Sequence, residues 1–107
     1  MKKDFKLFII GLTIKKDSTD IRESISIKIW EKAKNIGLGI SYYDPLIPSY
    51  MNIKRKSITS ASLKAKDLIV ILVNHKEIDK KVLLKANIPI IDTKNIFLEK
   101  HDNVYKF

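Results

Sequence analysis

The sequence predicts an α/β fold, a three-layer, Rossmann-like domain in which a mostly parallel sheet is flanked by helices. Short apolar runs that end near Gly, Pro or Asp are typical of buried strands in parallel sheets. Segments with apolar residues at helical spacing separate these runs. Strands that alternate with helices favour right-handed crossover connections, which place helices on both faces of the sheet.

The first half of the chain predicts a strand, a helix and a second strand. Residues 6–11 form an apolar run that ends in Gly11, and a polar loop through Arg22 follows. Apolar residues then recur at helical spacing between Ser24, the expected N-cap, and Gly37, the expected stop. They are Ile25, Ile29, Trp30, Ala33 and Ile36. Residues 38–43 predict the second strand, which Asp44-Pro45 closes because the residue before proline avoids helical geometry.

The second half continues the alternation. The expected elements are a loop at residues 48–57, a short helix at 60–66, a central strand at 68–73, a helix at 76–85 and a fourth strand at 89–92. No element is predicted beyond Phe97. In such sheets ligands bind beyond the carboxyl ends of the strands, so the informative loops follow Gly11, Tyr43, Val73 and Ile91.

The composition limits the classes of protein that need to be considered. With 107 residues, 45% hydrophobic and 31% charged, residues 1–107 are expected to form a single domain with one ordinary core. Cysteine is absent, which excludes disulfides, thiolate metal sites and a cysteine nucleophile. The apolar runs are too short to span a membrane and no signal peptide is evident, so the expected location is the cytoplasm, without membrane partners.

The formal net charge of +9 suggests nucleic-acid binding as one alternative. Only Arg22 and Arg55 among the 21 basic residues are Arg, and the lysines are scattered through every element. Base recognition favours the Arg fork, and no recognition motif is present. We therefore expect no nucleic-acid partner.

Four segments carry a resemblance that covers almost the whole chain. They are Gly11-Leu12-Thr13-Ile14-Lys15 with the later Arg22-Glu23-Ser24, then Tyr43-Asp44-Pro45-Leu46-Ile47-Pro48, residues 66–78, and Ile91-Asp92-Thr93-Lys94-Asn95-Ile96. In this order and spacing they resemble the motifs of the C-terminal, UDP-binding domain of the UDP-glucose/GDP-mannose dehydrogenase family. Ile14 replaces the usual Phe, and Thr93-Lys94 replaces the commoner Gly-Arg. Members that act on UDP-N-acetylhexosamines, such as UDP-N-acetylmannosamine, vary at this last motif, so the departure points to that substrate class.

The resemblance implies a role for four residues. Ile14, Lys15 and Lys94 would contact the bound UDP-sugar, with Lys94 paired to diphosphate oxygens. Arg22 would reach toward NAD held by another domain. The alternatives are a solvated loop lysine at Lys15 and a structural salt bridge at Arg22.

The remaining conspicuous residues are assigned structural roles. Asp44-Pro45 and Asp20 are expected to shape loops, and Trp30 to lie in the helix core. His75 is expected to be a loop residue near a strand end, because no partner motif accompanies it. No catalytic residue and no metal ligand is assigned.

The parts that a complete dehydrogenase needs are missing from this sequence. The family oxidises the C6 alcohol of a nucleotide sugar to a carboxylate with NAD and a cysteine, in the synthesis of polysaccharide precursors. Here no Gly-x-Gly-x-x-Gly follows a strand and no cysteine exists. NAD would be bound by other domains of a full enzyme, and the expected partners are a UDP-sugar, an N-terminal NAD-binding domain and a central dimerisation domain.

Two other functions bear on this sequence. A receiver-like signalling domain needs a phosphoacceptor Asp after the central strand and acidic residues after the first, where this sequence has Asn74 and Gly11-Leu12. A degenerate domain kept for oligomer contacts without ligand binding stays open, given Ile14 and Lys94. The oligomeric state stays open as well, a homodimer included.

Overall fold

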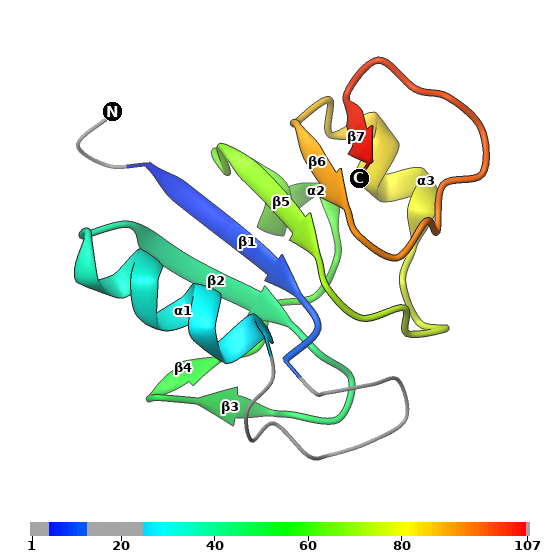
Figure 1. The fold of residues 1–107 in the computed structure, drawn as a ribbon. Helices are drawn as coiled ribbons and strands as arrows, with labels where there is room; N and C mark the ends of the chain where they lie inside the picture. The colour runs from blue at the N-terminus through cyan, green and yellow to red at the C-terminus, as the bar shows by residue number, and fades with distance from the viewer. Residues whose placement is uncertain (1–4, 13–24, 107) are drawn as a thin grey trace.

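The computed structural model describes residues 5–12 and 25–106 and confirms the predicted three-layer α/β architecture (Figure 1). The elements are β1 (Lys6–Ile10), α1 (Ile25–Asn35), β2 (Gly39–Tyr43), β3 (Ser49–Tyr50), β4 (Ile53–Lys54), α2 (Ser60–Leu63), β5 (Leu68–Ile71), α3 (Lys80–Lys85), β6 (Ile90–Asp92) and β7 (Val104–Lys106). The main sheet has the strand order β2-β1-β5-β6-β7, and every pairing in it is parallel.

The two faces of the sheet hold two separate clusters of buried residues, because alternate residues of a strand point to opposite faces. Leu7 and Ile9 pack with Trp30 of α1 on one face. Phe8 and Ile10 pack with residues of α2 and α3 on the other. The predicted core role of Trp30 is confirmed: its ring is 2% exposed and lies edge-to-face on Tyr42 and on Tyr50, with centroids 5.8 and 4.9 Å away.

Helix α1 ends as predicted at a glycine. Gly37 has a φ of +84°, and Leu38 N donates to Ala33 O at 3.0 Å across the end of the helix. The expected apolar stripe was wrong at its two ends, since Ile25 is 63% and Ile36 59% exposed. The expected N-cap, Ser24, lies outside the described residues.

Two other expectations need correction, and the tail for which no element was predicted forms a strand. The expected loop at 48–57 contains a hairpin, because β3 and β4 pair antiparallel through Met51 and Asn52, both at positive φ. The helix expected from residue 76 begins only at Lys80, where Asp79 is the N-cap and its Oδ1 accepts from Val82 N at 3.2 Å. The segment beyond Phe97 adds a fifth strand, β7, parallel to β6.

The described part of the chain contains no helix that is both long and apolar enough to cross a membrane.

Candidate functional site

The carboxyl ends of the parallel strands meet at one edge of the sheet, which we call the carboxyl edge. From β1 the chain passes through α1 to β2 on one side, and later enters β5 on the other side of β1. The strand order therefore reverses between β1 and β5 (Figure 1). In open α/β sheets this reversal is where ligands bind.

Gly11 lets the loops after β1 and β5 touch at this point. Its φ is +98°, and a Cβ there would lie 2.5 Å from Val73 Cβ. Gly11 N donates to Tyr43 O at 2.8 Å, and its carbonyl accepts from Ser26 Oγ at 2.6 Å, which ties the start of α1 to the edge. Only a residue without a side chain fits this position.

Asp44 joins three loops of the carboxyl edge. Its side chain is fully buried, Oδ2 accepts from Leu12 N and Oδ1 from Leu46 N, both at 2.8 Å. His75 Nε2 lies 3.3 Å from Asp44 Oδ2. Arg55 adds an outer tie, since its Nη1 donates to Pro45 O at 2.7 Å. These bonds give Asp44 a structural role in this edge, in agreement with the sequence prediction.

The position of His75 was predicted only in part. It lies in the loop after β5 as expected, but its side chain is 1% exposed and pairs with Asp44, 31 residues earlier. Nothing in the local sequence signals this pairing, because it depends on two loops that meet only in the folded sheet.

Two tyrosines at the end of β2 lie in this partly buried, charged surrounding. Burial raises the pKa of Tyr42 to about 12, with a further rise from Asp44, and its hydroxyl donates to Ile47 O at 2.8 Å. Burial likewise raises the pKa of Tyr43, and Glu77 adds to that rise. Both phenols are therefore neutral hydrogen-bonding groups at physiological pH.

The loop after β6 is organised by a second buried carboxylate. Asp92 is 1% exposed, and its Oδ1 accepts from Lys94 N at 3.2 Å and from Ile96 N at 3.1 Å. Its Oδ2 accepts from Phe97 N at 3.0 Å. Three backbone donors on one carboxylate hold residues 93–97 in a tight turn.

This turn presents Lys94 to solvent at the carboxyl edge. The Lys94 side chain is exposed, while Thr93 Oγ1 donates to Ile71 O at 2.6 Å and fixes the turn to the end of β5. Asn95, at a φ of +57°, accepts from Lys106 Nζ at 2.6 Å, so β7 supports the turn from the other side. A lysine ammonium on a fixed turn at this edge can meet a phosphate group.

Of the residues predicted to bind ligands, the structure places Lys94 alone. Ile14, Lys15 and Arg22 lie outside the described residues. The sequence predicted that Asp44 shapes its loop, but it did not predict which groups Asp44 binds or that Asp92 holds the turn after β6.

Neither a metal site nor a dinucleotide cradle is present among the described residues. Within residues 5–12 and 25–106, no group of three or more His, Cys, Asp or Glu side chains could hold a metal ion. The glycines do not form a dinucleotide cradle either: the space beside Gly11 is filled by Val73, Gly37 follows α1, and Gly39 is the first residue of β2. This chain therefore lacks a cradle for NAD among its described residues.

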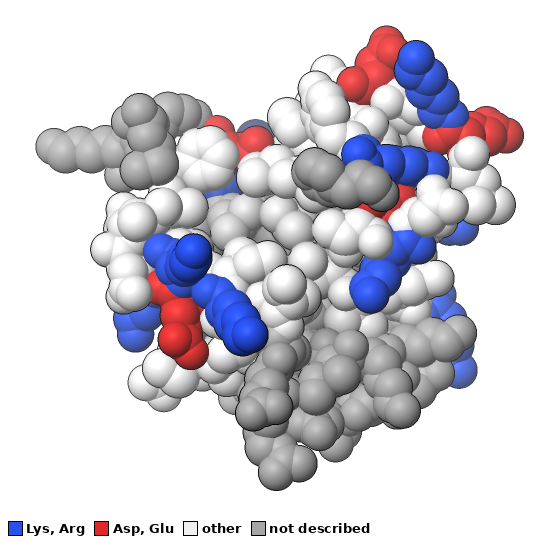
Figure 2. Space-filling model, in the orientation of Figure 1, with Lys and Arg blue, Asp and Glu red and all other residues white. Residues whose placement is uncertain are grey.

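The viewed face of the molecule carries no continuous basic stripe among its described residues. Figure 2 shows Lys and Arg side chains on this face that are separated by uncharged surface and by acidic side chains. A duplex would be bound by clustered cations, so this face offers no support for that alternative.

The parallel sheet, its reversal point and the tethered lysine turn define a Rossmann-like ligand-binding domain. The chain matches the model of the UDP-glucose/GDP-mannose dehydrogenase family, UDP binding domain, over residues 8–99. It belongs to this family, as the sequence motifs predicted.

Two solved structures show the same fold. A derivative structure of the UDP-N-acetyl-mannosamine dehydrogenase Cap5O from S. aureus has 25% identity and a TM-score of 0.72, and the match covers 98% of this chain and 27% of that chain. The native Cap5O structure has 28% identity and the same TM-score, over 96% of this chain and 26% of that chain. This chain thus spans about a quarter of the length of either. No curated protein sequence matches it.

Proposed function

We propose that residues 1–107 act as one domain that binds the UDP part of a UDP-sugar at the carboxyl edge. The observation that carries this proposal is the turn after β6, where Asp92 holds the backbone and Lys94 is exposed beside the reversal point. An ammonium there can pair with diphosphate oxygens as a point charge, although it lacks the bidentate geometry of Arg.

The family motif after β1 supplies the other proposed contacts. Gly11 and Leu12 lead from β1 onto the carboxyl edge, where Leu12 N is bound by Asp44. Ile14 and Lys15 follow directly, and we assign them to the nucleotide sugar on the family motif. Arg22 is assigned to the dinucleotide of a neighbouring domain on the same ground.

The complete reaction that we propose is the NAD-dependent oxidation of the sugar C6 alcohol to a carboxylate, for polysaccharide precursors. NAD, when bound to another domain, accepts the hydrides. This chain contributes binding and orientation, since it contains no cysteine and no dinucleotide cradle among its described residues. The similarity to Cap5O, a UDP-N-acetyl-mannosamine dehydrogenase, and the Thr93-Lys94 departure favour a UDP-N-acetylhexosamine as substrate.

A titration of the nitrogen-15-labelled chain tests the binding step. UDP, UDP-glucose and UDP-N-acetylhexosamines should give saturable amide shifts around residues 92–97, with a dissociation constant on the order of 1 mM, or about 4 kcal/mol. Lys94→Gln and Lys15→Ala should weaken these shifts, while Lys81→Gln, an equal charge change on exposed α3, should not.

Two controls complete the titration. NAD and a short DNA duplex should leave the spectrum unchanged. A folded chain that shows no UDP shifts at millimolar concentration would refute autonomous binding. Self-association of that chain in sedimentation would then support the alternative of a domain retained for oligomer contacts.

A further inference from the structure

A basic pocket lies at the opposite end of the sheet, which we call the amino edge. It has a volume of about 250 Å³, far above the roughly 10–15 Å³ that suffices for one water molecule. Three lysines line it, Lys6, Lys56 and Lys66, together with Ser41 and an apolar wall that includes Ile53.

Backbone hydrogen bonds bring these three lysines together from separate parts of the chain. Asp67 N donates to Lys6 O at 2.8 Å, which sets Lys66 beside the start of β1. Lys56 N donates to Tyr42 O at 2.8 Å, which sets Lys56 along the outer edge of β2. The cluster is therefore built by the fold and does not arise from a run of lysines in the sequence.

Ser41 supplies a polar group at the base of this pocket. In the parallel register it lies opposite Phe8, so it points to the same face of the sheet as Lys6, two residues before Phe8. Ser41 is 7% exposed, and its Oγ has no hydrogen-bond partner among the described residues. A buried hydroxyl is normally paired, so this one is available to a bound oxygen atom.

The charges of the pocket favour an anion. Burial lowers the pKa of Lys66, and the positive charges of the neighbouring Lys6 and Lys56 lower it further. Asp67 offsets part of this charge, since its Oδ2 accepts from Lys6 N at 2.8 Å. A bound dianion would relieve the remaining repulsion.

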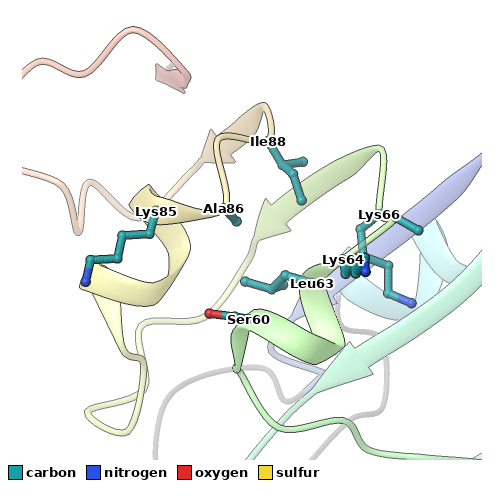
Figure 3. Close-up of a pocket in the computed structure, with 8 residues that line it drawn as sticks. Ser60, Leu63, Lys64, Lys66, Lys85, Ala86 and Ile88 are labelled. Carbon is teal, nitrogen blue, oxygen red and sulfur yellow. The ribbon is translucent and has the colours of Figure 1, made fainter.

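The adjoining pocket extends this basic surface toward α3. It has a volume of about 370 Å³ and shares Lys66 (Figure 3). Lys64 lies on the same side as Lys66, whereas Lys85, at the end of α3, points away from them (Figure 3). The site that the geometry favours therefore centres on Lys66.

We infer that the amino edge holds a second anion site, in which Ser41, Lys6, Lys56 and Lys66 bind a phosphate group. The site is separate from the carboxyl edge, where UDP binding is proposed. It does not depend on that proposal, because no residue is shared between the two.

Inorganic phosphate is the probe that tests the site. Amide shifts of the labelled chain should saturate at residues 39–41, 56 and 66 as phosphate replaces chloride at constant ionic strength. Lys66→Gln should weaken binding at least tenfold, or about 1.4 kcal/mol, and Lys56→Gln provides the same test if the first variant does not fold. Lys81→Gln should stay within about twofold, since its side chain is exposed on α3.

Ser41→Ala separates a binding role from a structural one. It should weaken phosphate binding and leave the thermal stability of the free chain equal or higher, because a hydroxyl without a partner is removed. A loss of stability would show that the hydroxyl is satisfied within the chain, and would overturn the site.

A second ligand distinguishes a lipid headgroup from a soluble compound as the source of the phosphate group. Phosphatidylcholine vesicles with and without phosphatidic acid are compared with free phosphate. Sedimentation only with the acidic vesicles, lost in Lys66→Gln, would assign the site to a lipid headgroup, and saturation by free phosphate alone would assign it to a soluble compound. Shifts that stay linear and match those from chloride, with no vesicle binding, would overturn the site while leaving a UDP response at Lys94 unaffected.

Discussion

Replacing Gly11 by alanine tests the contact on which the carboxyl edge depends. A Cβ there would lie 2.5 Å from Val73 Cβ and 2.8 Å from Val73 N. Gly37 supplies a matched control, because its φ of +84° is close to the +98° of Gly11 and no heavy atom lies within 4 Å of where its Cβ would stand. The two variants share the backbone strain and differ in the clash.

The expected magnitudes follow from these two contributions. Alanine in a left-handed conformation costs about 1–2 kcal/mol, and the restricted unfolded chain offsets about 0.4–1 kcal/mol of this. Gly37→Ala should therefore lower the free energy of unfolding by roughly 0–1.6 kcal/mol. Overpacking adds about 1–3 kcal/mol at Gly11, so Gly11→Ala should lower it by roughly 1–5 kcal/mol.

Urea denaturation followed by the fluorescence of buried Trp30 measures both variants. Adding Val73→Ala to Gly11→Ala should not restore stability, because Val73 Cβ and N remain in the way. An equal decrease in the free energy of unfolding for Gly11→Ala and Gly37→Ala would refute the close approach of the loops after β1 and β5. Rescue by Val73→Ala would restrict the clash to the Val73 methyl groups.

Three further changes test the tethered turn and the tyrosine at the end of β2. Asp92→Asn should lower the free energy of unfolding in urea by about 1–3 kcal/mol, because an amide in place of Oδ2 cannot accept from Phe97 N. An unchanged urea midpoint would contradict the tether. Lys94→Gln, at an exposed position, should keep that midpoint and weaken UDP binding about tenfold in the amide titration; equal affinity would count against the proposed contact. Because the pKa of Tyr42 is raised from 10.0 to about 12, its contribution to stability is full below pH 10 and is lost as the pH rises to about 12. Tyr42→Phe should flatten this alkaline loss in thermal unfolding, and parallel curves for the two proteins would show that another group causes it.

The central strands and the end of α1 were predictable because local sequence patterns indicate them. Strands β1 and β5 are covered on both faces, so they require continuous apolar runs, and residues 6–11 and 68–73 provide them. The end of α1 was predictable for a similar reason, since Gly37 adopts the left-handed conformation that glycine favours.

The peripheral elements were not predictable from the same signals. Strand β7 lies at the edge of the sheet, and its residues Val104, Tyr105 and Lys106 are half-buried or exposed, so no apolar run marks it. The hairpin turn at Met51 and Asn52 needs two positive φ values, and Met is an unusual residue for the first of them. Tertiary packing of Tyr50 on Trp30 stabilises this hairpin, and that contact is invisible in the local sequence.

In the candidate site, too, some features have a local sequence signal and others depend on tertiary contacts. The motif at residues 91–96 placed Lys94 in a loop after a strand, and this loop lies at the carboxyl edge because a parallel sheet brings all such loops to one edge. The pairing of Asp44 with His75 could not be found, since it joins residues 31 positions apart in loops without any pattern of their own. Sequence motifs therefore predicted where the candidate loops lie more fully than which bonds hold them in place.

Asp44 and Asp92 explain why motifs of this kind can match without every member touching a ligand. Each follows or ends a strand, each is buried, and each accepts hydrogen bonds from backbone N–H groups of the loops at the carboxyl edge. A buried carboxylate satisfied by such donors is costly to replace, because its removal leaves the donors unpaired. The exposed Lys94 side chain carries no such structural constraint. Lysine at this position, in place of the family's usual Arg, can therefore change ligand preference while the turn beneath it stays the same. The buried acids thus preserve the shape of the site, and the exposed positions are where its specificity can vary.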